Sequence, residues 1–147
     1  MRLPTQLLQR KVKTHKGDYG HILILAGSSR YSGAALLCAE AAMRSGAGLV
    51  TLGIPESINL AIIKNKTREV MSLPLKETKA GTLSLSAFAR ISTILKRIDV
   101  LIIGPGLGAN PSTYSLIRKV IRSCKHPMVI DADALNALNN NLTILKR

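Results

Sequence analysis

Four short apolar segments, separated by stretches with helical character, constrain the fold of this chain more than any other feature of its sequence. They cover residues 21–26, 49–54, 99–103 and 127–131, and each contains or adjoins a Gly or a Pro. Nearly continuous apolar runs of this length, rich in β-branched residues, are typical of strands buried in a parallel sheet. The pattern also predicts a shorter strand over residues 70–75.

The stretches between these strands carry helix-start signals. Ser32 can cap a helix that ends near residue 45, and Ser86 can cap one that ends at residue 97. Asn110, followed by a Pro at the first helical position, is a third start signal, and a short helix is expected near residues 56–65. Strands that alternate with helices form right-handed βαβ units. We therefore expect an α/β fold with a mainly parallel sheet.

The composition is strongly basic and poor in aromatic residues. The chain of 147 residues carries 21 Lys+Arg against 8 Asp+Glu, a formal net charge of +13, and 3% of its residues are aromatic. Most of the bases are expected on polar helix faces or in last helical turns, where cations are favourable. A solvated basic surface is the simpler interpretation, and a field that attracts an anionic substrate is the functional one. Without an aromatic platform, we expect no nucleic-acid partner.

The sequence predicts no membrane span, because the longest uncharged run, residues 100–117, contains several Gly and Pro residues. We expect a cytoplasmic protein with no membrane partner. The two cysteines, Cys38 and Cys124, are interpreted as small apolar side chains in a reducing compartment. We expect residues 1–147 to form a single domain, in which residues 1–16 are a basic lead-in segment.

Three segments rich in Gly or Asp directly follow predicted strands. They are residues 27–33, 104–108 and 131–133. Ligands of open parallel sheets bind at the carboxyl ends of the strands, so these segments are candidates for a binding site. Neither glycine segment matches a P-loop or a dinucleotide fingerprint, because the required lysine and third glycine are absent. Bare glycine backbone lets a ligand approach closely, and a tight turn is the alternative explanation for each segment.

Asp131 and Asp133 carry the most reactive side chains of these segments. Their carboxylates could bind a metal or polarise a substrate hydroxyl, and a helix cap or a turn is the alternative role. His15, His21 and His126 are too scattered to predict a metal site. No arrangement of Ser, His, Asp or Cys indicates a covalent nucleophile.

Several sequence blocks, spread over about residues 15–138, follow one another in a distinctive order. The blocks are His15-Lys16-Gly17-Asp18-Tyr19-Gly20, Ala26-Gly27-Ser28, Tyr31-Ser32-Gly33-Ala34-Ala35, Ala42-Met43-Arg44-Ser45-Gly46-Ala47-Gly48-Leu49-Val50, Ile103-Gly104-Pro105-Gly106-Leu107-Gly108 and Asp131-Ala132-Asp133-Ala134-Leu135-Asn136. Together, and with these gaps between them, they resemble the ADP/ATP-dependent NAD(P)H-hydrate dehydratase family.

The resemblance implies a ribokinase-like, three-layer α/β/α fold. It also implies a repair reaction that dehydrates the S epimer of hydrated NADH or NADPH, with ADP or ATP as phosphoryl donor and Mg²⁺. Phosphorylation of the ring hydroxyl makes phosphate a good leaving group, and elimination then restores the nicotinamide. By the same resemblance, Asp131 and Asp133 shape the floor of the site, and the substrate is lined by Ala34, Ala35, Gly106 and Gly108.

The family pattern continues for about as much chain again, and its catalytic base is the Asp of a Gly-Thr-Gly-Asp segment. These 147 residues contain no such segment. The resemblance therefore implies a partial domain, about half of the full fold, with no catalytic residue among those present. We expect the chain alone to be inactive and poorly soluble or oligomeric, with a separate C-terminal half or a second copy as partner. The alternatives are a ribokinase-like kinase for vitamin precursors and a non-catalytic basic module that binds nucleic acid.

Overall fold

The computed structural model describes residues 12–139 and 142–145, which are arranged around a five-stranded sheet. Every strand pairing is parallel, and the spatial order is β3-β2-β1-β4-β5. The strands are β1 (His21–Leu25), β2 (Leu49–Pro55), β3 (Met71–Leu75), β4 (Val100–Ile103) and β5 (Met128–Ile130). Leu25 at the end of β1 lies beside Gly53 of β2 and Ile103 of β4. The parallel α/β fold predicted from the apolar segments is confirmed.

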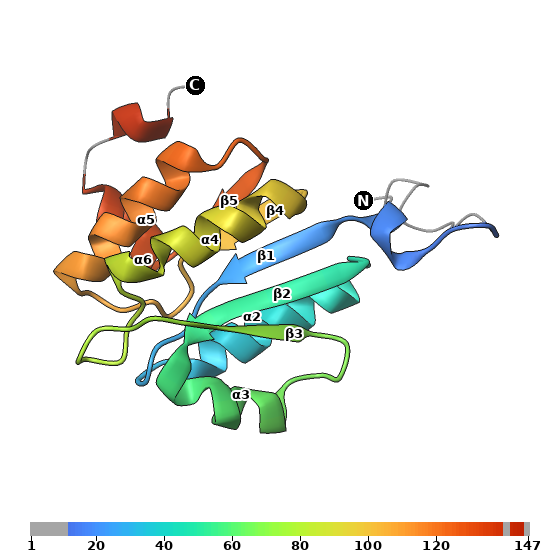
Figure 1. Cartoon of the computed structure of the whole chain (residues 1–147), viewed down its shortest axis with the longest axis horizontal. Helices are drawn as coiled ribbons and strands as arrows, with labels where there is room; N and C mark the ends of the chain where they lie inside the picture. The colour runs from blue at the N-terminus through green and yellow to red at the C-terminus, as the bar shows by residue number, and fades with distance from the viewer. Residues whose placement is uncertain (1–11, 140–141, 146–147) are drawn as a thin grey trace, which may run out of the picture.

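Helices cover both faces of this sheet (Figure 1). One face carries α2 (Ser32–Arg44) and α3 (Asn59–Asn65), and the other carries α4 (Phe88–Ile94), α5 (Pro111–Ser123) and α6 (Asp133–Leu138). Short 3₁₀ helices complete the described chain: η1 (Lys16–Tyr19), η2 (Glu56–Ile58), η3 (Leu85–Ala87), η4 (Leu95–Arg97) and η5 (Leu142–Leu145). No helix of the described residues is long and apolar enough to cross a membrane.

The two helical layers use different side chains to bury the sheet. On α2 the buried residues are all alanines, Ala35, Ala39 and Ala42, so the helix backbone lies close to β1 and β2. On α5 the buried face is bulky and includes Leu116 and Ile117. Each fully buried aliphatic side chain of this size contributes about 1.5–3 kcal/mol relative to an exposed one. The short α2 side chains bring the start of this helix close to the carboxyl ends of the strands.

Of the three predicted helix caps, one is confirmed and two are wrong. Asn110 caps α5 as expected, and its Oδ1 accepts the backbone N–H of Ser112 at 2.9 Å. Ser32 is instead the first residue of α2, and the N-cap residue Tyr31 makes no side-chain cap bond. Ser86 is not a cap either, because it lies inside the 3₁₀ helix η3, which precedes α4. The N-cap residue of η3 is Ser84. The Ser84 hydroxyl accepts the backbone N–H of Ser86 at 3.2 Å.

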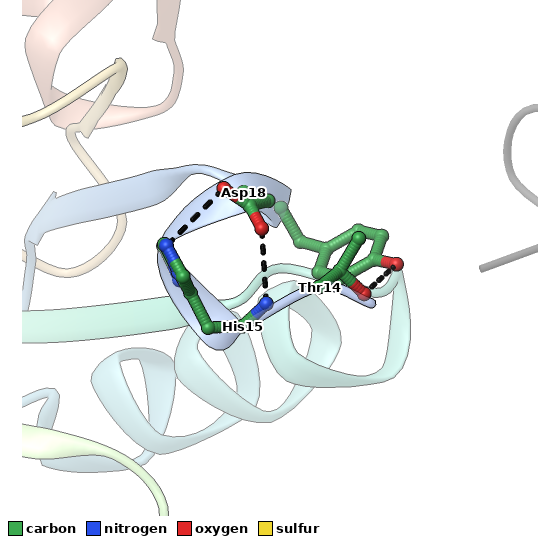
Figure 2. A network of polar contacts seen from close by, with 5 residues as sticks. Thr14, His15 and Asp18 are labelled. Atoms are coloured by element: carbon green, nitrogen blue, oxygen red, sulfur yellow. Dashed lines mark hydrogen bonds and ion pairs between the residues drawn. The ribbon is translucent and has the colours of Figure 1, made fainter. Parts of the chain in front are cut away.

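The block at residues 15–20 folds into a self-capped turn at the amino end of the sheet (Figure 2). Asp18 Oδ2 accepts the His15 N–H at 2.9 Å, and the carboxylate also lies 3.5 Å from His15 Nε2. Gly48 donates its N–H to Tyr19 O at 3.1 Å, and a Cβ on Gly48 would lie 1.7 Å from the carbonyl oxygen of Lys16. This part of the family pattern therefore seats the turn against the start of β2, away from the carboxyl ends. Residues 1–11 of the expected basic lead-in lie outside the described residues.

Candidate functional site at the carboxyl ends of the strands

The three segments that were predicted to form a site meet at one edge of the sheet. After β1, the Gly27 N–H donates to Pro105 O, in the loop that follows β4, at 2.8 Å. After β5, the Asp131 N–H donates to Ile103 O, the last residue of β4, at 3.1 Å. Main-chain hydrogen bonds therefore join the β1, β4 and β5 loops. Their relative positions depend on backbone geometry, which glycines make accessible.

Gly106 and Ala34, two of the residues predicted to line the substrate, lie against each other. Gly106 has a φ of +67°, and a Cβ at this position would lie 2.9 Å from Ala34 Cβ and 2.8 Å from Tyr31 Cβ. Only glycine combines this left-handed backbone with such a close approach. Ala35 faces the opposite way, fully buried in the core beneath the loop, where a Cβ on Gly27 would lie 2.9 Å from its own. Ala34 is half-buried at the surface of the same turn.

Gly108 and Asp133 are joined directly. The Gly108 N–H donates to Asp133 Oδ2 at 2.8 Å, and Asn136 Nδ2 donates to Asp133 Oδ1 at 3.4 Å. Gly108 has a φ of +79°, again in the left-handed region. Asp133 is the first residue of α6, so its carboxylate connects the β4 loop to that helix. The structure thus places Asp133 where it holds the glycine loop in position.

Asp131 is exposed and lies near the helix on the other side of the sheet edge. Burial raises the pKa of the Cys38 thiol in α2, and the negative charge of Asp131 raises this pKa further. The carboxylate of Asp133, in contrast, binds the β4 loop through one oxygen, which accepts the backbone N–H of Gly108. The described residues contain no group of three or more His, Cys, Asp or Glu side chains that could hold a metal ion.

A fourth segment, which the sequence analysis missed, reaches the same edge. An antiparallel bridge between Glu77 and Leu83 closes a turn after β3, and Gly81 O at its tip accepts the Ser29 N–H at 2.9 Å. A Cβ on Gly81 would lie 1.8 Å from Ser29 Oγ. The buried Thr113 hydroxyl fastens the base of this turn by donating to Leu83 O at 2.7 Å. The sequence signal for this turn is Gly81, which is followed by the hydroxyl side chain of Thr82 and the apolar side chain of Leu83.

Two further features of the edge bear on binding. The Ser28 hydroxyl is 1% exposed and has no hydrogen-bond partner among the described residues, and it lies beside Gly108. On the surface, the Tyr31 side chain is 47% exposed, and the Arg30 guanidinium carbon lies 5.8 Å from the centre of its ring. A cation and an aromatic face therefore stand next to the bare backbone of Gly106. Such an edge suits an anionic ligand with a planar ring.

Fold and edge together define a class of protein: a ribokinase-like α/β protein with a ligand edge made from glycine loops. A ribokinase-like protein of Enterococcus faecalis shares the fold, with a TM-score of 0.77 at 22% identity over 95% of this chain and 48% of that one. The sequence model of the NAD(P)H-hydrate dehydratase family matches residues 22–147, and the chain belongs to this family. The implied ribokinase-like fold and family membership are both confirmed.

Two relatives indicate how much of the family pattern is present. The bifunctional NAD(P)H-hydrate repair enzyme Nnr of Moorella thermoacetica is 43% identical over 141 residues, which are 96% of this chain and 26% of that enzyme. The ADP/ATP-dependent NAD(P)H-hydrate dehydratase of Bacillus subtilis, co-crystallised with ATP and Mg²⁺, is 29% identical with a TM-score of 0.68, over 86% of this chain and 42% of that one. The chain therefore spans about a quarter of the first relative and under half of the second.

Proposed function

We propose that this chain supplies the hydrate-binding surface of an ADP- or ATP-dependent dehydratase that acts on the S epimer of NAD(P)H-hydrate. The observation that carries the proposal is the contact of Gly106 with Ala34 and Tyr31. It brings two separate blocks of the family pattern together at the carboxyl ends of the strands, where open parallel sheets bind their ligands. The working partner in this proposal is the remaining part of the fold, on the same chain or a separate one.

The chemistry of the edge suits such a substrate. A hydrated dinucleotide is bulky and carries a negatively charged pyrophosphate, so it needs small side chains and a positive field. The small, half-buried side chain of Ala34, packed against Gly106, leaves the surface of the edge free of bulky side chains for the hydrated ring, and Arg30 with the overall charge of +13 attracts the pyrophosphate. Gly108 contributes indirectly, because its backbone N–H anchors the glycine loop to Asp133. Ala35 supports the turn from within the core rather than lining the substrate.

In the proposed reaction, ADP or ATP supplies the phosphoryl group that converts the ring hydroxyl into a leaving group. Elimination of phosphate breaks the carbon–oxygen bond and restores the dihydronicotinamide. The described residues hold and orient the substrate for this step: Asp133 fixes the glycine loop, and Asp131 closes the floor. We assign the donor site, Mg²⁺ and the catalytic base to residues beyond these 147. A cytoplasmic location, homo-oligomer formation and the absence of a nucleic-acid partner stay predictions.

Binding of the substrate by the chain itself tests the proposal. The ¹⁵N-labelled chain is titrated with the S epimer of NADH hydrate, and the backbone amide shifts are followed. We expect shifts at residues 30–34 and 106–108, and binding at least about tenfold weaker in Ala34→Leu, whose longer side chain occupies the space in front of Gly106. Leu37→Ala, on the exposed side of the same helix, is the matched control. Shifts confined to other regions, or equal binding by Ala34→Leu, would rule out this assignment.

A further inference from the structure

A second concave surface lies at the opposite ends of the strands from the proposed hydrate edge. It is a groove of about 470 Å³ between α4 and the open face of β2 and β3. On this face of the sheet, Leu23 of β1 and Leu101 of β4 are fully buried in the cluster shared with α4, α5 and α6, whereas Leu73 of β3 is only partly buried at its margin. The groove is lined by His21, Thr51, Met71, Leu73, Arg90, Thr93, Ile94 and Arg97.

The lining divides into a polar wall and an apolar wall. Arg90, Thr93 and Arg97 recur at helical spacing along α4 and η4, so their side chains emerge on one face. Opposite them, the sheet contributes Met71, which is 42% exposed, and Leu73. A ligand in this groove therefore meets cationic and hydroxyl donors on one side and apolar surface on the other.

The floor of the groove is held rigidly by His21. Its Nδ1 lies 3.1 Å from Arg97 O, and because a carbonyl oxygen only accepts, Nδ1 carries the hydrogen. Nε2 lies 2.8 Å from the Thr51 hydroxyl, which ties the ring to β2. The imidazole thus joins β1, β2 and the end of η4, and it holds the main chain at Arg97 in place.

The two arginines of the groove have no carboxylate partner among the described residues. Asp99 is the only acidic residue from Thr78 to Ile130, a stretch that contains eight Lys or Arg residues. Its Oδ2 is occupied by the His21 N–H at 2.7 Å. The carboxylate of Asp99 thus lies beside the groove but forms no ion pair with Arg90 or Arg97 among the described residues.

We propose that this groove binds a small organic anion, a phosphate or carboxylate group attached to an apolar body. The anionic group binds Arg90 and Arg97, for which guanidinium geometry is well suited, and the body packs on Met71 and Leu73. The volume lies within the usual range of small-molecule sites, about 300–1,000 Å³. The site is separate from the hydrate edge and does not depend on the proposed dehydratase function.

The test titrates the ¹⁵N-labelled chain with three probes: AMP, decanoate and inorganic phosphate. We expect at least one of the two organic anions to shift the amides of residues 71–73 and 90–97. AMP as the stronger probe indicates a nucleotide ligand, and decanoate as the stronger probe indicates an acyl ligand. Inorganic phosphate, which lacks the apolar body, binds at least about tenfold more weakly.

Variants separate a built site from general charge attraction. Arg90→Gln combined with Arg97→Gln weakens binding of the stronger probe at least about tenfold, and Met71→Ser weakens it by a smaller factor. Arg122→Gln, an exposed arginine of α5 outside the groove, leaves the affinity unchanged. The proposal is overturned if Arg122→Gln weakens binding as much as the double variant, if inorganic phosphate binds as well as the organic anions, or if neither organic anion shifts the groove. Shifts by AMP at residues 106–108 alone also overturn it.

Discussion

Replacing Gly106 by alanine tests the geometry of the ligand edge most sharply. The glycine has a φ of +67°, and this left-handed conformation costs a residue with a Cβ about 1–2 kcal/mol. The new Cβ would lie 2.8 Å from Tyr31 Cβ and 2.9 Å from Ala34 Cβ, closer than the roughly 3.5–4.0 Å at which carbon atoms pack. Because the loop must shift as well, we expect Gly106→Ala to lower the free energy of unfolding by about 2–3 kcal/mol.

Urea denaturation measures this loss. With an m-value of about 2 kcal/mol per molar urea, the midpoint of Gly106→Ala falls by roughly 1 M. Gly33→Ala is the matched control, since Gly33 lies in α2 with open space around its missing Cβ. There the substitution raises the free energy of unfolding by about 0.5–1 kcal/mol, because alanine is the better helix former. Equal midpoints for wild type and Gly106→Ala would refute the contact with Tyr31 and Ala34.

Three further outcomes follow from single contacts. Asp133→Ala removes the acceptor of the Gly108 N–H and lowers the free energy of unfolding by about 1–2 kcal/mol in the same assay, whereas Asp133→Asn, which keeps an acceptor oxygen, loses less. Because burial and the charge of Asp131 raise the pKa of Cys38, its alkylation followed by mass spectrometry is slow near neutral pH, accelerates as pH rises, and is faster in Asp131→Asn. The folded state keeps the Cys38 proton longer than the unfolded state, so this group lowers stability as pH rises above the ordinary thiol pKa. Val129→Lys, on the exposed edge strand β5, reduces concentration-dependent association measured by light scattering, and an unchanged mass distribution would show that β5 does not mediate it.

The sequence predicts the sheet well because its strands are continuous apolar runs. The segments at residues 21–26, 49–54 and 99–103 become β1, β2 and β4 with boundaries shifted by at most one residue. Local chemistry also predicts the start of α5, since Asn110 needs only the amide two residues later. The predicted cap at Ser86 was wrong because a 3₁₀ turn precedes α4, and Ser84 caps that turn instead.

The candidate site is predictable only in part, because its geometry comes from contacts between distant segments. Strand-end glycines and aspartates indicate which loops meet, and Gly106 and Ala34 are indeed in contact. The bond from Gly108 to Asp133 joins residues 25 positions apart, and nothing in the local sequence distinguishes Asp133 from Asp131 as its acceptor. The turn carrying Gly81 is missed for the same reason: it reaches Ser29 across 52 positions.

Turnover of the hydrate tests the central claim most directly. Residues 1–147 are assayed for NADH formation from the S epimer of NADH hydrate with ADP or ATP and Mg²⁺, first alone and then joined to the remaining C-terminal segment of the Moorella thermoacetica relative. If this chain supplies the hydrate-binding surface and other residues supply the base and the donor site, the joined protein forms NADH and the chain alone does not. NADH formation by the chain alone, or a folded but inactive joined protein, would contradict the account.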